Sequence, residues 1–301
     1  MDADYLIDRR RLKRRITFWR TAAIFAIVAA VTAGIYKYSG VESGDYIARL
    51  TIKNVIHNDL KRLAAIERVR KDDDIKALIV RINSPGGTVV GGEALYQALN
   101  RVRKEKPVIA VMDELATSAG YMIAVAADRI IAREGTVTGS IGVLFQTAEV
   151  TDLLNKLGIK FEAIKSAPLK AEPSPFSKIT PKVRAATKLL VDDMYAMFVD
   201  MVAKGRDMKL EKVRNLADGR VYTGRMALKN GLIDAIGGER HAKSWLVKEK
   251  KITKSLPIRD IRIRREVEDW LEYATSLIQK TSISERLILD GLVSVWHPWL
   301  Q

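Results

Sequence analysis

The chain has 301 residues and a formal net charge of +15 at pH 7, and 48% of its residues are hydrophobic, which is enough material for a sizeable buried core. It contains no cysteine, so cysteine catalysis, thiolate metal sites and disulfides are excluded. The positive charge suits nucleic acid, an anionic membrane or a merely basic protein, but we expect no nucleic-acid partner because the sequence has no RNP-like motif, zinc-finger spacing or basic zipper.

An apolar segment near the N-terminus predicts a membrane anchor. Residues 21–36 carry no charge, and residues 16–38 are long enough to span a bilayer if the flanking cations reach the interfaces. Seven cations lie within residues 9–20, so positive-inside bias places a basic segment, residues 1–15, in the cytoplasm. We therefore expect a single-pass protein whose remaining chain lies outside the cytoplasm, with a cleaved secretory signal as the alternative.

Beyond the anchor, strand-like and helix-like patterns alternate. Runs of apolar residues predict strands, and apolar residues repeated at helical spacing predict helices. In chain order we expect a strand at 45–52, a helix at 57–72, a strand at 75–82, a turn at 83–87, a helix at 91–105, a strand at 107–113, a helix at 118–128, strand and turn at 129–145, a helix at 150–158 and a strand at 159–166. This alternation indicates a layered α/β core.

The character of the sequence changes after this core. Residues 167–181 hold four of the eight prolines, which predicts an extended loop. A long helix with a broad apolar face follows over 181–205, and short helices are expected around 217–238. We expect residues 45–250 to form one domain, and residues 251–301 to form an amphipathic tail with no obvious place in its core.

The stretch "DELATSAGYMIAVAAD" places Ser118 at the expected start of a helix. Serine caps helices well, so a purely structural role is open. The functional alternative is a nucleophile on a strand-to-helix turn. Upstream, the turn "NSPGG" ends in Gly86 and Gly87, whose backbone N–H groups, with the N–H of Ala119, suit an oxyanion hole. A plain tight turn would need the same glycines.

A serine nucleophile needs a base. Of the three histidines, none belongs to an H-E-x-x-H pattern, and His57 and His241 lie in charged segments typical of solvated surface. We therefore expect no metal, and lysine is the usual substitute for histidine. A lysine base must lose its proton near neutral pH, which needs an apolar site or a cationic neighbour. Lys170 is the most suggestive candidate because it lies between Leu169 and Ala171 in the proline-rich loop; the alternative is a solvated loop lysine.

Taken together, the chain resembles signal peptide peptidase A, the serine–lysine membrane protease family of bacteria. The resemblance covers roughly residues 45–250 and rests on five motifs in order: "RINSPGG", "ATSAGYMIAVAADRIIA", "TVTGSIGVL", "IKSAPLKAEPSPF" and "LADGRVYTGRMALKNGLID". It implies a ClpP/crotonase-type α/β fold, a repeated ββα superhelix preceded by one transmembrane helix.

Carried over by position, the resemblance implies roles for single residues. Ser118 is the expected nucleophile, Lys170 the general base and Ser140 the residue that orients Lys170. The N–H groups of Gly87 and Ala119 are the expected oxyanion hole. Family members usually have glycine where this chain has Ala119, so the amide is retained, and we expect the added methyl to narrow the adjoining pocket.

The resemblance also implies partners and an address. The family assembles as rings or domes with sites shared between subunits, so we expect a homo-oligomer, an octamer, without a cofactor. Expected substrates are apolar peptides, namely signal peptides left after their release from preproteins. The expected location is the bacterial inner membrane, with the catalytic domain in the periplasm. Two alternatives are a crotonase-fold acyl-CoA enzyme, which an extracytoplasmic location disfavours, and a non-catalytic membrane scaffold, which the joint presence of Ser118, Ser140 and Lys170 disfavours.

Overall fold

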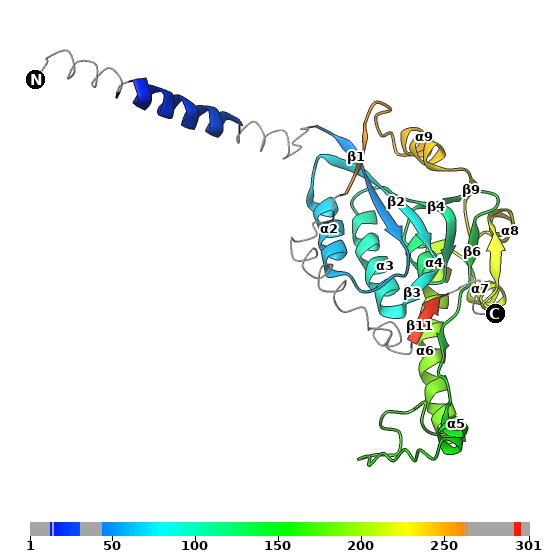
Figure 1. Ribbon diagram of the computed structural model, residues 1–301. Helices are drawn as coiled ribbons and strands as arrows, with labels where there is room; N and C mark the ends of the chain where they lie inside the picture. The colour runs from blue at the N-terminus through cyan, green and yellow to red at the C-terminus, as the bar shows by residue number, and fades with distance from the viewer. Residues whose placement is uncertain (1–12, 14, 31–43, 262, 264–291, 296–301) are drawn as a thin grey trace, which may run out of the picture. The chain divides into compact units, whose positions relative to one another are not determined.

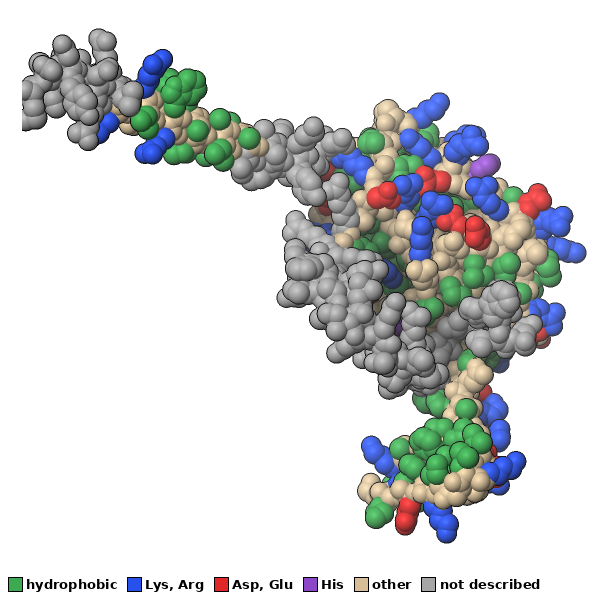
Figure 2. Space-filling view, in the orientation of Figure 1, with side chains coloured by type: hydrophobic (Ala, Val, Ile, Leu, Met, Phe, Trp, Pro, Cys, Tyr) green, Lys and Arg blue, Asp and Glu red, His purple; other side chains and the backbone are tan. Residues whose placement is uncertain are grey.

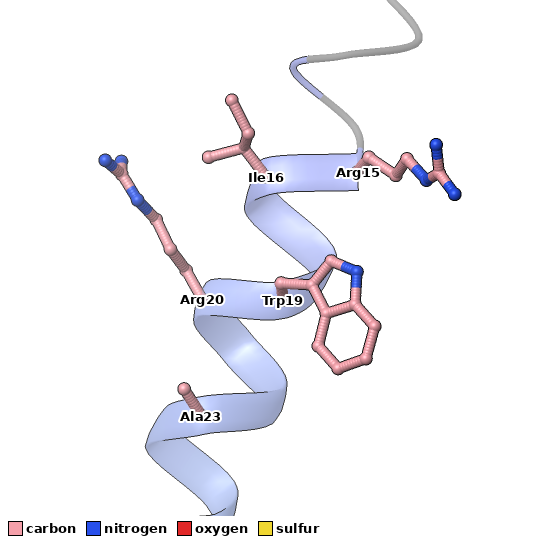
Figure 3. Close-up of a pocket in the computed structure, with 5 residues that line it drawn as sticks. All are labelled: Arg15, Ile16, Trp19, Arg20 and Ala23. Atoms are coloured by element: carbon pink, nitrogen blue, oxygen red, sulfur yellow. The ribbon is translucent and has the colours of Figure 1, made fainter.

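The computed structural model describes residues 13, 15–30, 44–261, 263 and 292–295 (Figure 1). The chain divides into two units, residues 1–44 and residues 45–301. In the first unit, residues 15–30 are helical. Figure 3 shows Arg15 and Arg20 leaving this helix in different directions, with the exposed indole of Trp19 beside them. In the parts of the chain that the structure describes, no helix is long and apolar enough to cross a membrane, and the anchor expected over 16–38 lies partly outside those parts.

A mostly parallel sheet forms the centre of the second unit. Its main path has the order β10-β1-β2-β4-β5-β9, all neighbours parallel, while β6 pairs parallel with β4 and antiparallel with β8. The strands are β1 (Tyr46–Lys53), β2 (Ile75–Ser84), β4 (Val108–Thr117), β5 (Arg129–Ala132), β6 (Val137–Gly139), β8 (Val221–Thr223), β9 (Ala235–Ile236) and β10 (Ile258–Asp260). The central strands are buried on both faces, as their continuous apolar sequences require.

Helices cover both faces of this sheet (Figure 1). The two faces of the sheet pack against two separate apolar clusters. Consecutive residues of β1 point to opposite faces, so Ala48 lies in the larger cluster and Ile47 in the smaller one. The larger cluster includes residues of α2 (Leu60–Lys71), α3 (Val89–Arg103), α4 (Ala119–Ala124), α7 (Leu210–Leu216) and α8 (Gly224–Asn230). The smaller cluster lies under α9 (Glu239–Glu249) and includes Ala242 and Leu246.

An arm, defined here as residues 146–190, extends from this body. It follows the short strand β7 (Leu144–Phe145), contains α5 (Thr151–Lys156), and returns to the body along α6 (Pro181–Arg206). Figure 1 places α5 and the chain next to it at the far end of α6. Figure 2 shows hydrophobic side chains gathered at the end of the arm. The exposed large apolar side chains of the arm are Leu153, Leu157, Ile159, Phe161, Ile164, Leu169, Phe176, Leu189 and Leu190.

The structure confirms the expected α/β alternation and corrects it in three places. The strand expected over 159–166 is wrong, because these residues pair with no strand among those described and Ile164 is fully exposed. The helix expected over 118–128 is confined to α4. The turn expected over 83–87 leads directly into the strand β3 (Gly86–Thr88). Part of the expected tail also joins the main sheet, since β10 lies beside β1.

Candidate active site

Ser118 occupies a strained turn between β4 and α4. Its backbone has φ 55° and ψ −120°, a conformation that costs free energy for any residue with a side chain. The turn is held because the N–H of Ser118 donates to the carbonyl oxygen of Gly139 at 2.8 Å and the N–H of Met122 donates to the carbonyl oxygen of Ser118 at 2.9 Å. The hydroxyl makes no capping hydrogen bond to α4. Helix capping therefore does not account for this serine.

Two threonine hydroxyls tie the end of β4 to its neighbours. The hydroxyl of Thr117 donates to the carbonyl oxygen of Pro85 at 2.9 Å, and that of Thr138 donates to the carbonyl oxygen of Ala116 at 2.7 Å. These bonds hold the "NSPGG" turn, β4 and β6 together around Ser118. The sequence analysis did not identify either threonine, because a threonine near a strand end carries no signal of its hydrogen-bond partner.

Gly87 lies where no side chain fits. A Cβ built on it would be 1.9 Å from the carbonyl oxygen of Ile56. The close approach arises because Ile56 is hydrogen-bonded on both sides, with its N–H donating to Gly86 at 2.8 Å and its carbonyl accepting from Thr88 at 2.9 Å. Gly86 has φ +115°. Both glycines are thus required by the backbone, which brings β3 beside the start of α4.

Ala119 is fully buried, and its methyl group packs inward. A Cβ built on Gly92 of α3 would be 3.0 Å from the Cβ of Ala119. The volume that the methyl adds is therefore accommodated at Gly92, where α3 has no side chain.

Ser140 follows β6 and is linked to Ser118 through one residue. The carbonyl of Gly139 accepts from Ser118, and the N–H of Ser140 donates to the carbonyl oxygen of Arg220 at 2.9 Å. Ser140 also has a positive φ, 49°. Thus Gly87, Ser118, Ala119 and Ser140 come together where β2, β4 and β6 end.

Lys170 lies elsewhere, on the exposed loop of the arm between α5 and α6. In Figure 1 this part of the chain is at the end of the arm, away from α4. Its N–H donates to the carbonyl oxygen of Ala167 at 3.0 Å, and its side chain makes no hydrogen bond or ion pair with the described residues. A single chain therefore does not bring Lys170 to Ser118.

The loop that carries Lys170 contains an ion pair between Lys165 and Glu172. Nζ of Lys165 lies 2.5 Å from Oε1 of Glu172, whose side chain is only 10% exposed. Glu172 also accepts from the N–H of Ser174 at 3.1 Å and from the hydroxyl of Ser177 at 3.1 Å. The hydrogen bond from Lys165 lowers the pKa of Glu172. We call this arrangement the Lys165–Glu172 clamp. It has no sequence signal, because the two residues are seven positions apart in a loop without regular spacing.

An extended segment lies next to Gly87. The strand β11 (Leu292–Val295) pairs antiparallel with β3 on one side and with β7 on the other. Ser294 is paired with Gly87, and Val293 with both Thr88 and Leu144. The space between β3 and β7 thus accommodates an extended peptide backbone.

In the described parts of the chain, no group of three or more His, Asp or Glu side chains is placed to hold a metal ion.

Comparisons with known proteins indicate the family of the chain. The model of "Peptidase family S49" matches residues 100–253, and the model of "Clp protease" matches residues 42–135. The chain is 38% identical over 201 residues to "Putative protease slr0021" of Synechocystis sp., covering 66% of this chain and 72% of that protein. It is 36% identical over 198 residues to "Putative signal peptide peptidase SppA" of Enterococcus faecium, covering 65% of this chain and 58% of that protein. "Serine protease SPPA, chloroplastic" of Arabidopsis thaliana is 35% identical over 198 residues, covering 62% of this chain and 29% of that protein.

Proposed function

Because the chain belongs to peptidase family S49, we propose that it is a membrane-anchored serine endopeptidase in which Ser118 attacks the peptide bond and Lys170 is the general base. The family makes it a serine protease with a mixed α/β fold and a ClpP-like domain around a central sheet. The observation that carries the catalytic assignment is the conformation of Ser118, which is held in a strained strand-to-helix turn and makes no capping bond. A repeated ββα superhelix is the arrangement we propose for the whole catalytic domain.

The proposed reaction is acyl transfer in two steps. The neutral amine of Lys170 takes the proton of the Ser118 hydroxyl while its oxygen attacks the carbonyl carbon of the substrate. The negative charge on the carbonyl oxygen is stabilised by the N–H groups of Gly87 and Ala119, and Lys170 then gives the proton to the leaving amine. Water, activated by the same lysine, releases the acyl group from Ser118. Ser140 orients Lys170.

Lys170 must come from another subunit for this reaction to occur. We propose a homo-oligomer, an octamer, in which the arm of one subunit brings Lys170 to Ser118 of the next. The exposed apolar side chains at the end of the arm support this, because so large an apolar patch is typical of a surface that is covered by another protein. The sheet ends and the arm are then the two halves of one site.

The proposed substrates are apolar peptides, in particular signal peptides left in the membrane. The pairing of β11 with β3 and β7 supports an extended substrate that adds a strand beside Gly87. The anchor expected over residues 16–38 would hold the catalytic domain in the periplasm, close to peptides released from the inner membrane. Neither the acyl-CoA enzyme nor the scaffold has an observation in its favour.

The test is to mix two inactive variants. We expect Ser118→Ala and Lys170→Ala each to lower cleavage of an apolar peptide by about 10³-fold or more. When subunits of the two variants exchange, about one quarter of shared sites regain both residues, so activity should return to about that fraction.

Each outcome of the mixing experiment has a distinct meaning. A single variant that cleaves like the wild type would show that the serine–lysine assignment is wrong. If the variants exchange subunits, as shown by mass spectrometry of differently tagged chains, and activity does not return, the two residues are not supplied by different subunits.

A further inference from the structure

A basic hollow lies on the outer side of α9, on the opposite face of the sheet from α4. Its volume is about 470 Å³. Four of its lining residues are cations and none is acidic. The lining residues are Arg240, Lys243, Ser244, Val247, Lys248 and Lys254. Figure 2 shows Lys and Arg side chains gathered over this part of the molecule. The peptidase chemistry argued above makes no use of this hollow.

The fold builds the hollow from two walls. Arg240, Lys243 and Val247 lie at helical spacing along the outer stripe of α9, while Ala242 and Leu246 face the core. The second wall is the returning chain, which is fastened because Nζ of Lys243 donates to the carbonyl oxygen of Leu256 at 2.8 Å. The hollow is thus a fixed feature of the fold, with its shape set by packing on both sides.

The charge in the hollow is not neutralised within the described chain. None of its four cations has an ion pair with a described residue. Glu239, at the start of α9, forms an ion pair with Arg49 instead, with 3.0 Å between Oε2 and Nη1. Elsewhere on α9, the partly buried ring of Trp245 packs against the smaller cluster, with Lys250 and Arg129 at 5.4 and 5.7 Å from its centroid.

The hollow also lies close to the point where the chain enters the domain. The N–H of Ile47 in β1 donates to the carbonyl oxygen of Pro257 at 2.9 Å, only three residues after Lys254. The first strand of the domain therefore lies beside the segment that forms one wall of the hollow.

We propose that the basic hollow binds the phosphate groups of anionic phospholipids in the membrane that anchors the chain. A guanidinium group binds phosphate through paired hydrogen bonds, and the lysines add positive charge around it. Anionic lipids attract clusters of cations at the membrane surface. The proposal rests on the membrane anchor of the proposed function.

The experiment uses the full chain in lipid vesicles. Because the chain has no cysteine, a Thr253→Cys substitution at the rim accepts a single fluorophore. Quenching by nitroxide-labelled lipid headgroups is then compared between neutral phosphatidylcholine vesicles and vesicles that also contain phosphatidylglycerol. We expect quenching to be about three-fold stronger with phosphatidylglycerol and to fall at high salt.

Charge variants make the assignment specific. Lys248→Glu together with Lys254→Glu should abolish the lipid-dependent difference. Lys61→Glu with Lys104→Glu changes the net charge equally on exposed residues of α2 and of the C-terminal end of α3, and should leave the difference intact. Cleavage of a soluble peptide in detergent should be unchanged in both pairs, which verifies that they fold.

Five results would overturn the proposal. Equal quenching in both vesicles, or equal effects of the two variant pairs, would show that the contact does not depend on anionic lipid in the hollow. A fluorescence change caused by inorganic phosphate in neutral vesicles, at constant ionic strength, would assign the hollow to a free anion. Absence of quenching while the protein floats with the vesicles would leave the anchor standing and the hollow facing away. If the protein does not float with them at all, the anchor itself is wrong.

Discussion

Gly87 shows how strictly single residues determine this site. Its α-carbon lies so close to Ile56 that any Cβ would overlap a backbone carbonyl, and a carbonyl in a hydrogen-bonded strand pair cannot move aside cheaply. The position is therefore more restrictive than an ordinary glycine turn, in which only the sign of φ matters.

We predict that Gly87→Ala lowers the free energy of unfolding by about 2–3 kcal/mol because the Cβ forces the backbone of Ile56 apart. The kcat of peptide cleavage should also fall under conditions in which the variant is still folded, because the displaced strand carries a proposed oxyanion donor. Gly135→Ala is the matched control, because a Cβ there meets nothing within 4 Å. Chemical denaturation and kcat measure the two effects, and equal stability of the two variants would contradict the steric argument.

Glu172 is a positioning residue in the loop that carries Lys170. We predict that Glu172→Gln lowers kcat by about tenfold or more with little change in KM, because Lys165 loses its carboxylate partner and the loop is less well held. Glu162→Gln, on an exposed residue of the same arm, should behave like the wild type. Exchanging the charges, with Lys165→Glu and Glu172→Lys, should restore part of kcat.

The pH dependence of this clamp has a defined sign. Because the hydrogen bond from Lys165 lowers the pKa of Glu172, the carboxylate stays charged below the usual range for glutamate. The clamp is complete above that range and is lost as the pH falls through the lowered pKa. The measurement is the dependence of kcat on pH for the wild type and for Glu172→Gln. If kcat of the two proteins falls in the same way at acid pH, and kcat of Glu172→Gln is not reduced at higher pH, the clamp has no role.

At the scale of elements, α6 is joined to the end of the sheet by one arginine. Arg206 is only 9% exposed and lies 2.6 Å from Oδ1 of Asp234, while its Nε donates to the carbonyl oxygen of Gly231 at 3.0 Å. Asp234 also accepts from the N–H of Ile130 in β5 at 2.7 Å. The C-terminal end of α6, the turn before β9 and the start of β5 therefore share one polar junction.

We predict that Arg206→Ala lowers the free energy of unfolding by about 3 kcal/mol, because it leaves a half-buried carboxylate without its partner. Arg206→Lys keeps the charge but loses the paired hydrogen bonds, so its cost should be smaller, about 1–2 kcal/mol. Arg214→Ala, on an exposed residue of α7, should stay within about 0.5 kcal/mol of the wild type. Equal loss in Arg206→Ala and Arg214→Ala, measured by urea denaturation, would contradict the prediction.

Elements with strong local patterns were predictable from the sequence, and elements defined by partners were not. The apolar runs of β1, β2 and β4 and the amphipathic patterns of α2 and α3 predicted these elements to within a few residues. Residues 159–166 alternate like a strand but have no strand beside them among the described residues, and a strand exists only through its pairing. β10 was missed for the opposite reason, since three residues form a strand only because β1 lies beside them.

The sequence motifs predict Ser118, Ser140 and Lys170 as site residues, and that assignment stays a prediction. The distance of Lys170 from Ser118 within one chain depends on the direction of the arm, which the motifs do not report. The strained φ of Ser118 and the contact of Gly87 with Ile56 arise from tertiary packing, which no local pattern reports.

At the scale of the whole molecule, the C-terminal strand occupies the place that we propose for the substrate. β11 pairs with β3 and β7 along its length. We predict that a chain ending at residue 290 cleaves short apolar peptides with a kcat/KM about three-fold to tenfold higher than the full chain, because the peptide no longer competes with a tethered segment.

A backbone variant separates competition from other effects of truncation. Val293→Pro removes an N–H in the middle of β11 and should raise kcat/KM as the truncation does. Addition of a peptide with the sequence of residues 290–301 should inhibit the truncated chain. If truncation lowers activity instead, β11 forms part of the cleft and does not compete with the substrate.

The separation of Lys170 from Ser118 also bears on how such an enzyme is kept harmless. A single subunit carries its proposed nucleophile at the end of the sheet and its proposed base on a distant arm, so it would be inactive until it assembled. Dilution should restore that inactive state, and specific activity should fall with subunit concentration below the assembly threshold. Cells that make few copies would then contain mostly inactive subunits. Proteolysis would begin only where the concentration of subunits in the membrane is high enough for assembly.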